Sequence, residues 1–217
     1  MKKNQYECST IDFKNLGVFS AKLSEEQMEP IKSEINDIQK NFDLYDSRKH
    51  NSQLVGNIKR EYKLFECNRY LEHLFMPLVY EYDKKYGYVG QFDLPTKNSH
   101  VGLSSSWVNF QQKHEFNPIH SHDGILTFVI WIKIPYDMED ELKTSPGINS
   151  NYNAAGMFSF QYIDTTGTIR THNIPVDKSM ENCVILFPSK FNHCVYPFFS
   201  SDEYRISVSG NFKVKTD

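Results

Sequence analysis

The series of short apolar runs that follows residue 100 constrains the fold most. β-Branched and aromatic residues gather in these runs, and polar turn residues separate them, which predicts an antiparallel sandwich or barrel. Residues 125–135 are apolar almost throughout, as expected of a strand buried on both faces at the centre of a sheet. The runs read SWVNFQ, ILTFVIWIKIP, GMFSFQYI, IRTHNIP, CVILFP and YRISVSGNF.

The part of the chain before residue 96 predicts two helices instead. Ser24 and the two glutamates after it are typical of a helix start, because acidic residues favour the positive end of the helix dipole. Apolar residues spaced three and four apart then predict a helix over residues 25–42, and a second such pattern predicts one over 68–85 that ends at Gly87. A proline falls inside each span, so we expect a late start or a kink in both helices.

Residues 136–155 form the longest stretch without an apolar pattern. The stretch opens with acidic residues and becomes rich in Asn, Ser and Gly. Two interpretations stay open, a lid or binding loop and a disordered segment. The chain of 217 residues suits a single domain over residues 1–217, with a helical part at about 1–95 and a β core at about 96–214.

Charge and composition exclude several classes of protein. The 24 basic and 27 acidic residues give a net charge of −3, which lacks the basic footprint of a protein that binds duplex nucleic acid. No apolar run approaches the roughly 18 residues of a membrane span, and no apolar core follows the lysines at the start. The four cysteines form no CxxC pair, so we expect reduced thiols and a cytoplasmic protein.

The motif NPIHSHDG at residues 117–124 carries the strongest chemical signal. On an extended chain, residues two apart point to the same face, so His120 and His122 can share one metal ion. Neutral imidazole binds Fe, Zn, Cu and Ni, so the pair alone does not name the metal.

Three residues further along the chain extend this motif to a possible binding site for a metal ion and a carboxylate. His193 opens a strand after the turn LFPSKFN, and Arg205 and Ser207 then lie two apart on one face of the last core strand. Arginine binds a carboxylate through two parallel hydrogen bonds, and a serine hydroxyl adds a third donor. A dicarboxylate that chelates a metal ion at one end needs such an anchor at the other.

This order of residues resembles the Fe(II)/2-oxoglutarate-dependent oxygenase superfamily, in which HxH or HxD precedes a distal His and then RxS. More narrowly, the stretch around residues 107–135 and the earlier LVGNIKREY are similar to 2-oxoglutarate oxygenases encoded by marine tailed phages (cyanophage-like). The resemblance covers roughly residues 50–213. It implies an α+β fold, with a double-stranded β-helix core (a jelly-roll, cupin-like) and supporting N-terminal helices, and a cytoplasmic location in an infected host cell.

The resemblance also assigns roles to individual residues. Asn109 and Gln111, on the strand that leads into the motif, would support the iron site or contact the co-substrate, with outward-facing polar positions on an edge strand as the alternative. His114 and His172 match no motif and are interpreted as surface residues. The implied catalytic iron ligands are His120, His122 and His193, and the implied 2-oxoglutarate contacts are Arg205 and Ser207 with Asn109 and Gln111.

Two departures from the family pattern matter. The usual iron site has two histidines and one carboxylate, whereas the middle ligand here reads as His122. Asp123 is the rival, although on a regular strand it points away from His122 unless a bulge reverses it. Several members of the superfamily also use a tyrosine on the next strand to contact 2-oxoglutarate. That strand has no Tyr here, which leaves Thr127 as a polar contact, with either Phe128 and Ile130 or Val129 and Trp131 lining the barrel.

The implied activity is hydroxylation of an organic substrate with Fe(II), 2-oxoglutarate and O2, releasing succinate and CO2, with ascorbate as reductant. By analogy, the substrate is a prolyl or other peptidyl side chain, with a small molecule as the alternative. We expect the N-terminal helices and residues 136–155 to shape its specificity. Two other functions stay open: a cupin-like metalloenzyme that uses no 2-oxoglutarate, and a non-catalytic jelly-roll binding protein whose structural zinc could recruit Cys194.

Overall fold

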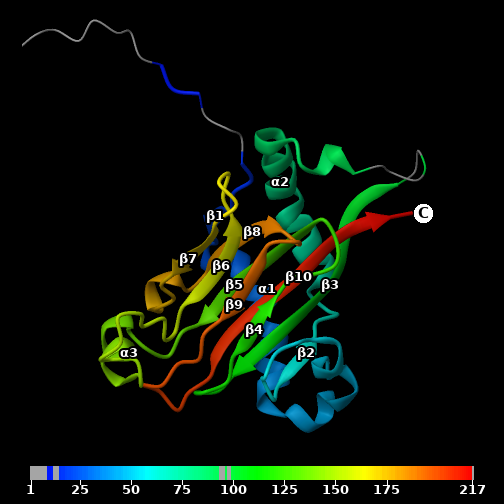
Figure 1. Cartoon of the computed structure of the whole chain (residues 1–217). Helices are drawn as coiled ribbons and strands as arrows, with labels where there is room; N and C mark the ends of the chain where they lie inside the picture. Colours follow the sequence, from blue (N-terminus) through cyan, green and yellow to red (C-terminus); the bar gives the residue numbers. More distant parts are fainter. Residues whose placement is uncertain (1–8, 12–14, 93–95, 97–98, 217) are drawn as a thin grey trace, which may run out of the picture.

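The computed structural model describes residues 9–11, 15–92, 96 and 99–216 (Figure 1). Within them the chain forms ten strands, three α-helices and four short 3-10 helices. The strands are β1 (Phe19–Lys22), β2 (Glu61–Lys63), β3 (His100–Gln111), β4 (Asn117–His120), β5 (Leu126–Lys133), β6 (Phe158–Ile163), β7 (Ile169–Ile174), β8 (Cys183–Pro188), β9 (Asn192–Val195) and β10 (Arg205–Lys215). The α-helices are α1 (Glu25–Lys40), α2 (Asn68–Tyr86) and α3 (Met138–Thr144). The 3-10 helices span Phe42–Arg48, Asn51–Gln53, Val89–Gln91 and Lys178–Met180.

The strands form two antiparallel sheets, so the predicted antiparallel architecture is confirmed. The large sheet has the order β1-β8-β5-β10-β3-β2, and the small sheet has the order β4-β9-β6-β7. From β3 onward the chain passes repeatedly between the two sheets, so strands distant in sequence become neighbours. The N-terminal part is not only helical, because β1 and β2 extend the large sheet at its two edges.

The two long helices begin and end close to the predicted bounds. Ser24 caps α1 through a reciprocal pair of hydrogen bonds with Gln27, of 3.2 and 2.9 Å. Gly87, in the left-handed region, ends α2. Pro30 and Pro77 lie inside the helices, so the expectation of a late start is wrong. In α1 the helix starts before Pro30 because the hydrogen bonds between Ser24 and Gln27 cap its first turn.

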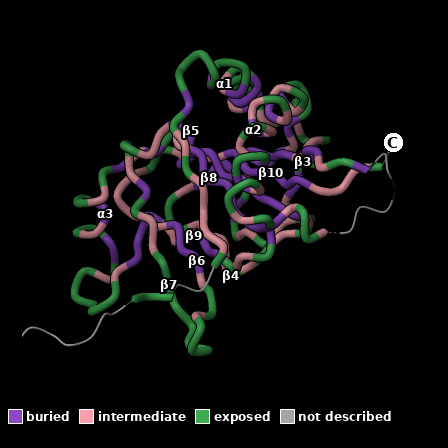
Figure 2. The backbone as a smooth tube through the Cα atoms, turned by 90° about the horizontal axis from the view of Figure 1, so that it is seen from above, coloured by how far each residue is buried: buried purple, intermediate pink, exposed green. Residues whose placement is uncertain are grey.

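The elements stack in three layers (Figure 2). Helices α1 and α2 cover one face of the large sheet, and the small sheet lies on its other side. Strand β5 is central and buried along nearly its whole length, as its apolar sequence predicts. Phe128 and Ile130 pack with the helices, whereas Val129 and Trp131 point between the sheets. The second of the two sequence alternatives for β5 is therefore correct.

Residues 136–155 are not a loop throughout, which corrects the sequence prediction. They contain α3, and its Glu141 is fully buried. The Glu141 carboxylate accepts hydrogen bonds from the backbone N–H groups of Phe199 (2.7 Å) and Ser200 (2.9 Å). A helix of seven residues is too short to leave a clear periodic pattern. Through Glu141, this helix holds the segment that precedes β10 in place.

None of the helices among the described residues is long and apolar enough to cross a membrane. Cys67, Cys183 and Cys194 are free, in agreement with the prediction of reduced thiols, and Cys8 lies outside the described residues.

Candidate metal centre and its cavity

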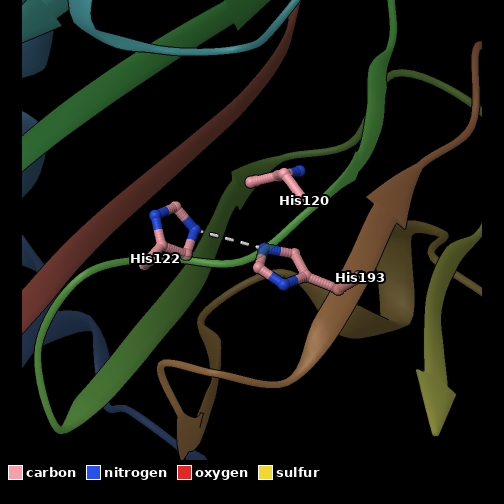
Figure 3. A group of neighbouring side chains, drawn as sticks. All are labelled: His120, His122 and His193. Carbon is pink, nitrogen blue, oxygen red and sulfur yellow. Dashed lines mark hydrogen bonds between the residues drawn. The ribbon is translucent and has the colours of Figure 1, made fainter.

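Three histidines meet on the inner side of the small sheet (Figure 3). His120 on β4 lies directly opposite His193 on β9, so the two side chains share one face, with ring centroids 4.2 Å apart. His122 follows β4, and its Nε2 lies 3.2 Å from Nε2 of His193. One ring nitrogen from each histidine falls within 4.8 Å of the others, so the three can hold one metal ion.

The neighbours of the motif hold His122 in this position. The backbone N–H of His122 donates to the carbonyl of Ser189 (2.8 Å). The hydroxyl of Ser189 lies 2.9 Å from Oγ1 of Thr127, which donates to Oδ1 of Asn211 at 2.8 Å. The chain then turns at Gly124, where φ is +112° and a Cβ would lie 2.6 Å from a backbone oxygen. Thr127 thus supports the motif from outside the cavity and is not the expected contact with a co-substrate.

Backbone carbonyls orient two of the rings. Nδ1 of His120 lies 2.7 Å from the carbonyl of Pro118, and Nδ1 of His193 lies 2.9 Å from that of Phe191. Because a carbonyl only accepts hydrogen bonds, Nδ1 carries the proton in both rings. The lone pair is then on Nε2, the usual arrangement for histidines that bind a metal ion.

The surroundings keep the three imidazoles neutral, which is the form that binds metal. Burial lowers the pKa of His120 and His193, and in His122 burial and the neighbouring His120 lower the pKa to about 3. Two nitrogens bound at right angles, each about 2.1 Å from one ion, would lie about 3.0 Å apart. The 3.2 Å between the Nε2 atoms of His122 and His193 is close to that value, so the donor set fits a divalent transition metal.

The rival ligands point away from this cluster. The Asp123 side chain is 87% exposed and lies 3.7 Å from Nζ of Lys190. Cys194, next to His193, pairs across the sheet with Ser159, on the opposite side of the strand. The geometry therefore groups His122 with the other two histidines and leaves both Asp123 and Cys194 outside the cluster.

Arg205 is buried, with only 2% of its surface exposed. Its Nε and Nη2 both donate to the Gln111 side-chain oxygen, at 3.1 and 2.7 Å. Its other donors bind the Tyr136 hydroxyl (2.6 Å) and the carbonyls of Gly156 and Tyr196 (both 2.8 Å). Every partner is neutral, and no described carboxylate forms an ion pair with Arg205. A buried cation without a counter-ion favours an anion, and a carboxylate that replaces the Gln111 oxygen can bind the Nε–Nη2 edge through both of its oxygens.

One cavity connects the histidine cluster to Arg205. Its volume is about 100 Å³, whereas one water molecule needs about 10–15 Å³, so a small organic acid fits. Its floor is the inner face of the large sheet, where Asn109, Ser207 and Trp131 lie in one row across three paired strands. Asn109 and Gln111 are 5% and 4% exposed and line the cavity, so the outward-facing alternative for them is wrong.

Two residues in and beside this cavity carry no signal in the local sequence pattern. Tyr136 comes just after β5, beyond the strand itself, and its hydroxyl accepts a hydrogen bond from Arg205 (2.6 Å). Glu61 lies opposite Asn109 across β2 and β3. The lining includes residues 53–56 and 58, whereas α1, α2 and residues 136–155 contribute none of the lining residues. Their part in specificity stays a prediction. His114 and His172 are exposed, as predicted.

Comparisons with known proteins agree with this geometry. A family described as "Putative 2OG-Fe(II) oxygenase" matches residues 105–211, slightly less than half of the chain. No curated protein sequence matches significantly. Among solved structures, a Pseudomonas putida prolyl-4-hydroxylase is 14% identical with a TM-score of 0.51, over 91% of this chain and 92% of that one.

A second similar structure is a prolyl hydroxylase from Trichoplax adhaerens in complex with a hypoxia inducible factor peptide fragment. It is 12% identical with a TM-score of 0.53, over 91% of this chain and 83% of that one. At such identities the likeness shows a shared fold and nothing about the reaction. Together with the family match, it supports the 2OG-Fe(II) oxygenase superfamily.

Proposed function

We propose that the chain is an Fe(II)- and 2-oxoglutarate-dependent oxygenase that hydroxylates an organic substrate. One observation carries the proposal: a cluster of three neutral imidazoles and a buried arginine without a counter-ion lie in the same cavity. A metal-binding end and a carboxylate-binding end are what 2-oxoglutarate requires. We assign the iron to His120, His122 and His193, and the far carboxylate to Arg205 and Ser207.

We infer that the two sheets form a double-stranded β-helix within a single domain over residues 1–217. Strands β3 to β10 divide evenly between the sheets, with β8-β5-β10-β3 in one and β4-β9-β6-β7 in the other. Eight strands in two such sheets agree with a jelly roll. The shared fold with two prolyl hydroxylases supports the same inference.

The residues of the chain have distinct tasks in this proposal. Iron with bound 2-oxoglutarate would supply the oxidation, in which the substrate, O2 and 2-oxoglutarate are converted to the hydroxylated substrate, succinate and CO2. Arg205 and Ser207 hold the co-substrate, while Phe158, Trp131 and Val195 give the cavity apolar walls that exclude water. Three neutral imidazoles leave the ion's charge of +2 uncompensated, so a dianion neutralises the site.

For the substrate, we propose a peptidyl side chain, with proline as the first to test. The support is the fold shared with two prolyl hydroxylases. This remains an argument from fold, because many functions share one scaffold.

Succinate formation tests the proposed function without knowledge of the substrate. Protein loaded with Fe(II) without oxygen then receives 2-oxoglutarate, ascorbate and O2. We expect slow succinate formation by the parent, none by His193→Ala, and far less than the parent's by Arg205→Ala when 2-oxoglutarate is near the parent's KM. The exposed residues His172 and Arg170 provide matched controls, since His172→Ala and Arg170→Ala should equal the parent.

The outcomes separate the alternatives. Metal-dependent activity that survives Arg205→Ala would favour a cupin-like enzyme without 2-oxoglutarate. A parent that forms no succinate, and shows no absorbance band when Fe(II) and 2-oxoglutarate are added together, would favour a binding protein.

A further inference from the structure

Glu61 is an acidic side chain within the cavity that the iron and 2-oxoglutarate sites do not use. It lies on β2 directly opposite Asn109, which lies opposite Ser207, so all three side chains share the inner face of the large sheet. Glu61 is 1% exposed. Among the described residues it is the only acidic one that lines the cavity, and it forms no ion pair.

Acceptor oxygens without donors gather around Glu61. Its Oε2 accepts a hydrogen bond from Asn51 (3.1 Å), and no described residue donates to its Oε1. Oδ1 of Asn109 and Oδ1 of Asn117 are both buried without a partner. Gly56 leaves room for this group, since a Cβ there would lie 2.2 Å from Oδ1 of Asn117 and 3.1 Å from Oε1 of Glu61. We call Glu61, Asn109 and Asn117 the acceptor cluster.

The chemistry of the acceptor cluster calls for a donor. A buried carboxyl with a single hydrogen bond and two buried amide oxygens with none are costly, and a group that donates to all three side chains removes that cost. An ammonium group has three donors and no acceptor, and its charge complements the carboxylate. Burial, and to a lesser degree Glu115, raises the pKa of Glu61 to about 8, as expected of a carboxyl that lacks a cation.

The cavity thus has two polar groups of opposite preference. Arg205 favours an anion, the acceptor cluster favours a cation, and both line the same cavity as the three histidines. The two groups adjoin at Asn109, whose amide N–H donates to the Ser207 hydroxyl (3.2 Å). We propose that the acceptor cluster binds a cationic amino group of the substrate, so that the substrate is a peptide or amino acid with a basic side chain. This inference rests on the proposed function and narrows its substrate.

Matched peptides test the preference for a cation in the parent protein. The probes are acetylated and amidated pentapeptides of glycine with lysine, norleucine, arginine, citrulline or proline at the centre. Two readouts are used: stimulation of succinate formation, and the Kd measured by calorimetry with protein that holds Mn(II) and 2-oxoglutarate. We expect the lysine peptide to have a Kd and a KM at least 10-fold lower than the norleucine peptide, or the arginine peptide to have values at least 10-fold lower than the citrulline peptide. If no cationic peptide exceeds its neutral partner in either readout, the inference is wrong.

A variant then ties the preference to the acceptor cluster. Glu61→Gln keeps the shape of the side chain and removes the negative charge that the carboxylate carries once a cation is bound, so we expect the KM for the better cationic peptide to rise at least 10-fold with kcat changed less than 3-fold. Glu66→Gln is the matched control, because Glu66 is exposed and outside the cavity, and it should retain the parent's preference. A preference that persists in Glu61→Gln would contradict the role of the cluster.

The two levels of the proposal fail in different ways. Succinate formed from 2-oxoglutarate without peptide supports the oxygenase even if the peptides bind equally. If no succinate forms, the oxygenase proposal fails, and calorimetry of the peptides still tests the acceptor cluster.

Discussion

The two faces of the large sheet differ sharply although the same strands make both. On β10, Ile206 and Val208 pack against the helices, whereas Arg205, Ser207 and Ser209 line the cavity. Side chains alternate along a strand, so one strand contributes to the core with every second residue and to the site with the others. The helix-side face stabilises the fold, and the cavity face holds polar groups that need partners.

The cavity face is not polar throughout, which refines the comparison. Val129 and Trp131 on β5 face the same cavity as Arg205. Phe158 stacks on the ring of His193, with centroids 5.4 Å apart. The large sheet's cavity face therefore combines polar residues with apolar ones, and the histidines have aromatic neighbours that keep them neutral.

The largest effect is expected from a substitution in the histidine cluster, on the cavity side of the large sheet. His193→Ala removes one of the three proposed metal ligands, so we expect loss of metal binding and of all succinate formation. Metal content after dialysis and circular dichroism measure binding and folding separately. Metal retained at the parent's level would contradict the assignment of His193.

The next largest effect is expected from a substitution in the core on the helix side of the large sheet. Phe75 on α2 is fully buried, with its ring centroid 4.5 Å from that of Phe128. Phe75→Ala should lower the free energy of unfolding by about 3–5 kcal/mol, because it leaves a cavity in the core. Urea unfolding measures this loss. The KM for 2-oxoglutarate of the folded fraction should stay within about 2-fold, and a larger change would show that the two faces are coupled.

Arg205 tests whether the polar end of the cavity recognises a carboxylate. Hydrogen bonds to a charged group contribute about 1.5–3 kcal/mol, so Arg205→Ala should raise the apparent KM for 2-oxoglutarate by about 10- to 150-fold. Arg205→Lys keeps the charge but loses the planar guanidinium, so its apparent KM for 2-oxoglutarate should lie between that of the parent and that of Arg205→Ala. A KM unchanged in both variants would remove Arg205 from the co-substrate site.

The pH dependence of stability should also distinguish the two faces, since the three histidines of the cluster lie on the cavity side. Their pKa values are lowered in the folded state, so the unfolded chain takes up protons first as the pH falls below about 6.5. Their contribution is complete above that pH and is lost toward pH 3, by at most about 1.4 kcal/mol per pH unit for each histidine. Urea unfolding of metal-free protein between pH 8 and 4.5 measures the slope. His122→Gln should reduce the slope of the free energy of unfolding against pH. An equal slope in that variant would show that the lowered pKa of His122 does not cause it.

The smallest effect is expected at Asp123. Its side chain is exposed and its contact with Lys190 is long, so Asp123→Asn should change the free energy of unfolding by less than about 0.5 kcal/mol. Metal content and succinate formation should match the parent. A loss of metal would instead show that Asp123 is a ligand.

Local sequence patterns were sufficient for the features that depend on neighbours in the chain. The start of α1 at Ser24 and the end of α2 at Gly87 follow from capping residues. The common face of Arg205 and Ser207 follows from the period of a strand. These features could be predicted because the backbone and nearby residues determine them.

Other features were decided only by the tertiary structure. Glu61 enters the cavity because β2 pairs with β3 in a register that sets it opposite Asn109. Tyr136 reaches Arg205 from beyond the end of β5. The direction of a side chain along its own strand is a local property. Its neighbour across the sheet depends on strand order and register, which the packing of the whole molecule determines.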